Sequence, residues 1–321
     1  MDNVKLELLW KSLTFSGQSD FEFVRIDADC IPELNIGLNR QFNRCLILEL
    51  PLTSKVDLVP VVRQHLSLDL FRDTGYIVIQ LTDAVYNDLF NDLVISLYRR
   101  IKDFSDIESI TTELIQSFHK WSQFFDAGRT NRLLPEQVRG LLGELLVLRE
   151  LINGSTASKL NEILNSWKGP YGLTHDFVSG LKNIEVKTRD TWQPDVRISS
   201  EYQLQEELNK GLELAVVCLD SDMEYGMSLS TLVIEIRQLI VAKLGDTTIM
   251  FDALFQHGLT IGNLSEYDNL RFKPISIHYY DCTGVNFPRL TRADLSREIS
   301  KVNYDIRTTA LNDFITAKKI F

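Results

Sequence analysis

The 321-residue sequence is poor in cysteine, poor in basic charge and free of long hydrophobic runs. Its cysteines form no CxxC pair, which argues against a zinc knuckle and against a disulfide framework. No segment reaches the roughly 18 consecutive apolar residues that a membrane span needs. The N-terminus also lacks the basic region and apolar stretch of a signal peptide. These absences predict a soluble, cytoplasmic protein with no membrane partner. The four cysteines are Cys30, Cys45, Cys218 and Cys282.

The charge balance is acidic, with 34 Lys and Arg against 44 Asp and Glu and a formal net charge of -10. Proteins that only coat nucleic acid are usually basic, because their affinity comes from neutralising phosphates. A role on nucleic acid would therefore depend on a local site, a metal ion or a protein partner. Motifs of several other chemistries are missing as well, since the sequence has no GxxxxGK[ST], GxGxxG, GxSxG, HExxH or HxE…CxxC pattern.

The apolar periodicity changes several times along the chain. A short amphipathic helix is expected over residues 1–13, followed by short apolar or alternating runs that predict strands. Two amphipathic helical patterns then begin after Asp83 and Asp106, which suit N-caps. The four predicted parts are a β-rich N-terminal module (1–82), a helical connector (83–126), a core (127–245) and a C-terminal α/β extension (246–321).

The segment HDFVSGLKNIEVKT carries charged residues within an apolar run. Side chains of a strand alternate between faces, so Glu185 and Lys187 share one face while Ile184 and Val186 share the other. Asp176 lies nine residues before Glu185, which suits the adjacent strand of a hairpin turning at SGLKN. An exposed Glu–Lys pair on a strand usually has no function. This acid-x-Lys triplet is, however, the only one in the chain.

The helix predicted over residues 135–152 carries an acidic residue on its apolar side. At about 100° per residue, Glu144 falls between Leu148 and Leu151. An unpaired buried carboxylate is costly, so Glu144 either has a partner such as a metal ion or a lysine, or lies at an edge with access to solvent. The chain order is then a Glu on a helix, an Asp, and Glu-x-Lys on a strand.

This order resembles the PD-(D/E)XK nuclease superfamily, in the form with an acidic residue on the helix before the catalytic hairpin. LLGELLVL, THDF and IEVKT match that pattern within roughly residues 130–220, with His175 in place of the Pro. A Pro194-Asp195 pair also occurs, but no acid-x-Lys follows it. More loosely, the whole chain is similar to uncharacterised bacterial PD-(D/E)XK-motif proteins encoded beside restriction and phage-defence genes. The features shared with them include GELLVL, HDF, EVKT and ISSEYQL.

The resemblance implies an α+β fold in which the β-rich module and the helical connector precede a restriction-endonuclease-like α/β core. In that core a mixed sheet is flanked by helices. It also implies phosphodiester hydrolysis with Mg²⁺ or Mn²⁺ as cofactor and Glu144, Asp176, Glu185 and Lys187 as catalytic residues. Asp176, Glu185 and the Val186 carbonyl would be the inner ligands, and Glu144 would complete the site directly or through water. Lys187 would position the attacking water or stabilise charge on the phosphorane.

Several further residues are candidates for the lining of this site. Thr188 and Arg189 could contact phosphate. Gln203, which begins a predicted helix, could face the site or belong to a solvated helix surface. His175 is expected to satisfy a local hydrogen bond, and Arg139 is expected to lie on the surface.

Two functional hypotheses follow from the resemblance. The first is a Mg²⁺-dependent DNA endonuclease belonging to a restriction or phage-defence system, and the second is a non-cleaving nuclease-fold scaffold in a defence complex. The acidic charge and the N-terminal module favour protein partners from the same locus in either case, and a homodimer is compatible with both. RNA is the alternative substrate to DNA. A third hypothesis is an unrelated α+β protein in which the triplet arose by chance.

Overall fold

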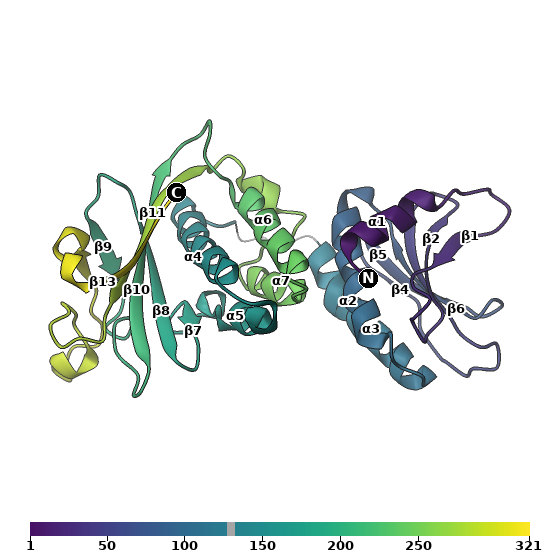
Figure 1. Ribbon diagram of the computed structural model, residues 1–321, viewed down its shortest axis with the longest axis horizontal. Helices are drawn as coiled ribbons and strands as arrows, with labels where there is room; N and C mark the ends of the chain where they lie inside the picture. The colour runs from purple at the N-terminus through teal and green to yellow at the C-terminus, as the bar shows by residue number, and fades with distance from the viewer. Residues whose placement is uncertain (127–131) are drawn as a thin grey trace. The chain divides into compact units, whose positions relative to one another are not determined.

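The computed structural model describes residues 1–126 and 132–321, and the chain forms two compact units (Figure 1). The first unit comprises Met1–Gly128 with Thr260–Gly262, and the second comprises the rest of the chain. The predicted start of the core, residue 127, lies outside the described residues. Within those residues, no helix combines the length and the apolar character needed to cross a membrane.

The first unit combines helices with an antiparallel sheet in the order β1-β2-β3-β6-β5-β4. The Asp106 carboxylate accepts a hydrogen bond from the Ser109 amide at 2.7 Å, which caps the third helix as predicted. Asp83 likewise accepts from the Val85 amide, at the start of a short 3-10 turn. The elements of this unit are α1 (Asn3–Ser12), β1 (Phe21–Arg25), β2 (Leu34–Asn39), β3 (Arg44–Glu49), β4 (Val61–Val62), β5 (Leu66–Phe71), β6 (Tyr76–Leu81), η1 (Ala84–Tyr86), α2 (Asn87–Ile101) and α3 (Ile107–Phe125).

The second unit is built on a five-stranded sheet with the order β13-β11-β10-β8-β7. Strands β8 and β10 are parallel, whereas the other neighbours are antiparallel, so the sheet is mixed. The predicted α+β fold is therefore confirmed. The helices and strands of this unit are α4 (Pro135–Asn153), α5 (Leu160–Ser166), β7 (Phe177–Val178), β8 (Lys182–Arg189), β9 (Asp195–Ile198), β10 (Gly211–Ser221), α6 (Leu229–Ala242), α7 (Thr247–Gln256), β11 (Phe272–Asp281), β12 (Tyr304–Arg307) and β13 (Ile315–Ile320).

The sheet of the second unit is covered on both faces. Figure 1 shows α4 and α6 on one side of it and the β9 and C-terminal segments on the other. Leu212, Leu214 and Val216 of β10 belong to the apolar cluster on the second side, together with Val196 and Ile306. This explains the unbroken apolar run over residues 214–219 of β10, since both faces of the strand are buried there.

One local prediction is wrong. Residues 201–204, expected to begin a helix, form a turn. The Gln203 side chain accepts a hydrogen bond from the Ser199 amide at 2.8 Å, and the Ser200 hydroxyl accepts one from the Tyr202 amide. Such local bonds between side chains and the backbone compete with helix formation.

Candidate active site

The predicted hairpin is present at residues 177–189. Phe177 pairs with Ile184 and Val178 with Asn183, and the turn is closed by a hydrogen bond from the Ser179 amide to the Lys182 carbonyl. β7 has only two residues, so β8 is paired with β7 over its first part and with β10 over its whole length. On the β7 side, the second half of β8 therefore has an open edge within the described residues, and Asp176 lies there.

Asp176 is held at this edge by its backbone and by its side chain. Its carbonyl accepts hydrogen bonds from the amides of Lys168 at 2.6 Å and Gly169 at 3.0 Å. Its carboxylate Oδ2 accepts one from the Val186 amide at 2.7 Å. Because the N–H and C=O of a strand residue point toward the same neighbour, the Val186 carbonyl is also directed toward the side of Asp176.

Glu185 and Lys187 share one face of β8, as the strand alternation predicts. The Lys187 Nζ atom lies 2.5 Å from Glu185 Oε1. Glu185 is 1% exposed, and the Lys187 side chain is 17% exposed. The other carboxylate oxygen of Glu185, Oε2, is buried and has no hydrogen-bond partner among the described residues. This oxygen is therefore free to accept a ligand or a proton.

The carboxylates of Glu144, on α4, and Asp176 both lie next to Gly169. The Trp167 indole N–H donates a hydrogen bond to Glu144 Oε2 at 2.7 Å. A Cβ placed on Gly169 would lie 2.3 Å from that oxygen and 2.9 Å from Asp176 Oδ1. The two carboxylates thus border the space that the missing side chain of Gly169 leaves. Gly143, next to Glu144, lets α4 approach β8, since a Cβ there would meet the Thr188 methyl group at 2.3 Å.

Burial makes all three carboxyl groups harder to ionise. It raises the pKa of Glu185 to about 8, with the charge of Asp176 adding to the effect and that of Lys187 opposing it. Burial and the charge of Asp176 also raise the pKa of Glu144 well above its usual value. The hydrogen bond from Trp167 acts in the opposite direction and lowers this pKa. The pKa of Asp176 is raised by burial as well, and the Val186 amide opposes this. A cation placed beside these groups would favour their ionised form and so oppose the effect of burial.

The residues present fit a small divalent cation. Mg²⁺ prefers hard oxygen ligands and is usually held by one or two carboxylates together with waters and substrate phosphates, not by an all-protein cage. No group of three His, Cys, Asp or Glu in residues 1–126 and 132–321 is arranged to enclose a metal ion, so waters and substrate phosphates would have to supply the remaining ligands. The carboxylates that flank Gly169 and the unpartnered Oε2 of Glu185 are suitable donors.

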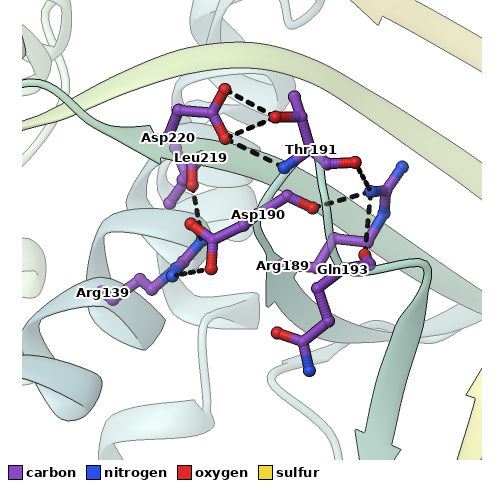
Figure 2. A network of polar contacts seen from close by, with 7 residues as sticks. All are labelled: Arg139, Arg189, Asp190, Thr191, Gln193, Leu219 and Asp220. Atoms are coloured by element: carbon purple, nitrogen blue, oxygen red, sulfur yellow. Dashed lines mark hydrogen bonds and ion pairs between the residues drawn. The ribbon is translucent and has the colours of Figure 1, made fainter.

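A polar network joins α4 to the ends of β8 and β10 (Figure 2). Arg139 of α4 forms an ion pair with Asp190 at 2.8 Å and donates to the Leu219 carbonyl at 2.5 Å. Its side chain is largely buried, so the expected surface position of Arg139 is wrong. The reason is that the charge of Asp190, which lies far from Arg139 in the sequence, makes the buried position tolerable.

The other predicted residues have partners of their own. Arg189 donates to the carbonyls of Asp190 and Gln193. Thr188 faces Gly143 on the α4 side of the strand. His175 is buried, and its Nδ1 atom lies 3.4 Å from the side-chain nitrogen Nδ2 of Asn183, in agreement with the predicted local hydrogen bond. The structure thus brings Glu144, Asp176, Glu185, Val186 and Lys187 to one region, and engages Thr188, Arg189 and Gln203 in local contacts.

Sequence reasoning did not single out Trp167 and Gly169. Both precede Asp176 in a stretch whose glycines and proline predict only a loop. Their importance depends on a contact with Glu144, which is 23 residues from Trp167. No local pattern signals such a contact.

The helix-flanked mixed sheet and the acidic hairpin edge define a protein of the PD-(D/E)XK nuclease-like class. Residues 6–309 match the family model described as "Putative PD-(D/E)XK family member, (DUF4420)". The match spans nearly the whole chain, and the chain belongs to this family. No curated protein sequence and no solved structure gives a significant match.

Proposed function

We propose that the protein is a metal-dependent endonuclease that hydrolyses phosphodiester bonds in DNA. The observation that carries this proposal is the convergence of Glu144 and Asp176 around Gly169, beside the strand on which Lys187 contacts Glu185. When bound, a divalent cation would polarise the scissile phosphate and lower the pKa of a water molecule.

Each residue has a role that follows from its position. The carboxylates of Asp176 and Glu185 would hold the cation, together with the Val186 carbonyl. Glu144, oriented by the Trp167 indole, would hold it directly or through water. Lys187 is the positively charged side chain of the site and would place its ammonium group against a phosphate oxygen as negative charge develops there.

We also propose a wider setting, in which the protein works in the cytoplasm as part of a restriction or phage-defence system. The formal charge of -10 supports a dependence on protein partners, because an acidic chain binds DNA weakly by itself. The first unit, with its own antiparallel sheet, is the part that we expect to contact a partner or DNA without taking part in the chemistry.

A non-cleaving scaffold is the second candidate function. Two observations favour it: the described residues provide no ready group of three metal ligands, and Lys187 is already paired with Glu185. In that case the second unit would keep the nuclease fold and serve only for assembly.

The test is cleavage of supercoiled plasmid DNA by the full-length protein with Mg²⁺, with Mn²⁺ and with EDTA. We expect metal-dependent nicking that falls at least about 100-fold in Asp176→Ala, Glu185→Ala and Lys187→Ala alike, since the three act as one unit. Lys182→Met and Glu213→Gln are matched controls, because these residues form a 2.6 Å ion pair on the same sheet outside the site. Both controls should cleave normally.

The outcomes separate the hypotheses. If the protein cleaves RNA but not DNA, RNA replaces DNA as the proposed substrate. Failure to cleave with every metal, even alongside the proteins encoded next to it, would favour the scaffold. Cleavage that survives Asp176→Ala and Lys187→Ala would place the active site elsewhere.

A further inference from the structure

The chain has four tryptophans, and one of them differs from the rest. Trp10, Trp121 and Trp167 are buried, with exposed fractions of 6% or less. Trp192 is 78% exposed. A single exposed aromatic residue needs no explanation by itself. The loop that carries Trp192 is unusual, however, because hydrogen bonds hold the residues before and after Trp192.

The guanidinium of Arg189 forms hydrogen bonds with the middle of this loop (Figure 2). Its Nη1 atom donates to the carbonyls of Asp190 at 2.8 Å, Thr191 at 3.4 Å and Gln193 at 3.1 Å. The Thr191 amide and hydroxyl in turn donate to the Asp220 carboxylate at 2.8 to 2.9 Å. The loop carbonyls are thereby directed toward Arg189, and the loop is tied to the end of β10.

Both ends of the loop are fastened too. The Asp190 carboxylate pairs with Arg139 of α4. The Pro194 carbonyl accepts hydrogen bonds from the amide of Thr308 at 2.9 Å and from its hydroxyl at 2.6 Å. Four of the five residues 190–194 are therefore held by hydrogen bonds. Within the described residues the fifth, Trp192, has neither a hydrogen bond nor a ring contact, and its side chain is largely exposed on a loop whose other residues are hydrogen-bonded.

The loop directly follows the strand that carries the proposed catalytic lysine. Trp192 follows Lys187 by five residues, so at about 3.4 Å per residue the two Cα atoms lie within roughly 17 Å. DNA that places a phosphate at Lys187 extends over several nucleotides on either side of that phosphate. Such a strand passes within reach of the loop, which makes DNA a better match for Trp192 than a protein partner.

The chemistry of the loop points to a base as the contacted group. Two arginines, Arg139 and Arg189, and two aspartates, Asp190 and Asp220, take part in this network, so their formal charges balance and leave no excess of positive charge for phosphates. It offers an indole ring on a backbone whose neighbouring residues are hydrogen-bonded, and every base has a face that can stack on such a ring. Hydrogen bonds that hold the backbone before binding reduce the entropy lost on binding.

We propose that Trp192 is a stacking platform for an unpaired base of the DNA substrate, close to the cleaved phosphate. This inference rests on the proposed nuclease function and deepens it, since it assigns a DNA contact outside the catalytic residues. Bases inside a duplex already stack on each other, so Trp192 binds single-stranded or locally opened DNA.

The test is binding of a fluorescein-labelled single-stranded 30-mer to the full-length protein, followed by anisotropy without divalent metal. Removing one base–aromatic stack should weaken affinity about 5- to 100-fold, so we expect this loss in Trp192→Ala and a smaller one in Trp192→Phe. Tyr225→Ala is the matched control, because Tyr225 is an 82% exposed aromatic residue of the same unit. Trp192→Ala and the control should keep the melting temperature of the wild type.

Tryptophan emission provides a second readout. DNA should quench the emission of the wild type and leave that of Trp192→Phe largely unchanged. Wild-type DNA binding that Trp192→Ala leaves intact would overturn the stacking proposal without touching the nuclease proposal. Binding with quenching, but no cleavage under any condition, would keep Trp192 as a DNA contact and overturn the endonuclease. Absence of DNA binding by the wild type, alone and alongside the proteins encoded next to it, would overturn the stacking proposal, while the plasmid cleavage assay decides the nuclease proposal separately.

Discussion

The indole of Trp167 donates a 2.7 Å hydrogen bond to the carboxylate of Glu144, 23 residues earlier in the chain. Trp167 is almost fully buried, so this bond fixes the direction of the only acidic side chain that α4 brings to the site. The same carboxylate borders Gly169, and Gly169 also borders Asp176. The orientation of Glu144 is therefore decided by residues outside the sequence motif.

Trp167→Phe should weaken metal binding while keeping the fold. Phenylalanine retains most of the buried ring but loses the N–H, so the Glu144 carboxylate loses its fixed direction. We expect the Mn²⁺ affinity, measured by calorimetry, to fall about 3- to 10-fold, in line with the roughly 0.5–1.5 kcal/mol of a typical hydrogen bond.

Trp10→Phe is the matched control for this change. Its indole donates a bond of similar length, 2.8 Å, to Asn91 in the first unit. This variant should lose comparable stability and keep its metal affinity. Equal metal affinity in Trp167→Phe and the wild type would show that Trp167 only fills space.

Gly169→Ala should disturb the site more strongly. The added methyl group would lie 2.3 Å from Glu144 Oε2, so this carboxylate must shift from the position in which it accepts the Trp167 hydrogen bond. We expect at least a 10-fold loss of metal affinity and of cleavage rate. Gly180→Ala is the control, since no heavy atom lies within 4 Å of a Cβ at that position and its φ is not positive. Unchanged metal binding in Gly169→Ala would exclude a direct role for Glu144.

Stability without metal should fall as the pH rises. The pKa of Glu185 is about 8 in the folded protein, above its usual value of 4.5, so the folded state binds the proton more tightly than the unfolded state. Its contribution to stability is complete below about pH 4.5 and is lost as the pH rises through about 8. The raised pKa values of Glu144 and Asp176 act in the same direction.

Melting temperatures in EDTA between pH 5 and 9 measure this effect. Glu185→Gln should flatten the decline and melt at a higher temperature than the wild type at pH 9, because the amide cannot ionise. Added Mg²⁺ should stabilise the wild type more at pH 8 than at pH 6, since a cation binds the deprotonated carboxylate. An identical pH profile in Glu185→Gln and the wild type would contradict the assigned pKa shift.

The ion pair of Arg139 and Asp190 should contribute to stability as a unit. Both side chains are largely buried, so Asp190→Asn leaves Arg139 with a poorly compensated charge. We expect a single substitution at Arg139 or at Asp190 to lower the free energy of unfolding by about 1–3 kcal/mol. The double variant should lose less than the sum of the two single losses. Urea denaturation measures all three. Arg72 and Asp57 form a solvent-exposed pair and serve as the control, for which about 0–1 kcal/mol is expected. Additive losses at Arg139 and Asp190 would mean that the two residues act independently.

Local features of this protein followed from the sequence. Pro135 and the apolar spacing after it predict α4, which begins at that residue. Period-two alternation predicts that Glu185 and Lys187 share a face, and their side chains are in contact. The nine-residue spacing from Asp176 predicts a hairpin, and β7 pairs with β8. These features depend on neighbours within one turn of helix or one hairpin, so a short window of sequence contains the information.

The remaining features were decided by tertiary packing. The sequence by itself indicated the candidate acids and the lysine of the hairpin, together with the strand and helix on which they lie. It did not indicate that Trp167 would orient Glu144, that Gly169 would leave the space between two carboxylates, or that Arg139 would be buried against Asp190. Contacts between segments far apart in the chain depend on how helices and strands pack, and packing is a property of the whole unit. The periodicity of one segment describes only the face that it can bury, whereas the partner that covers this face is selected when the unit folds.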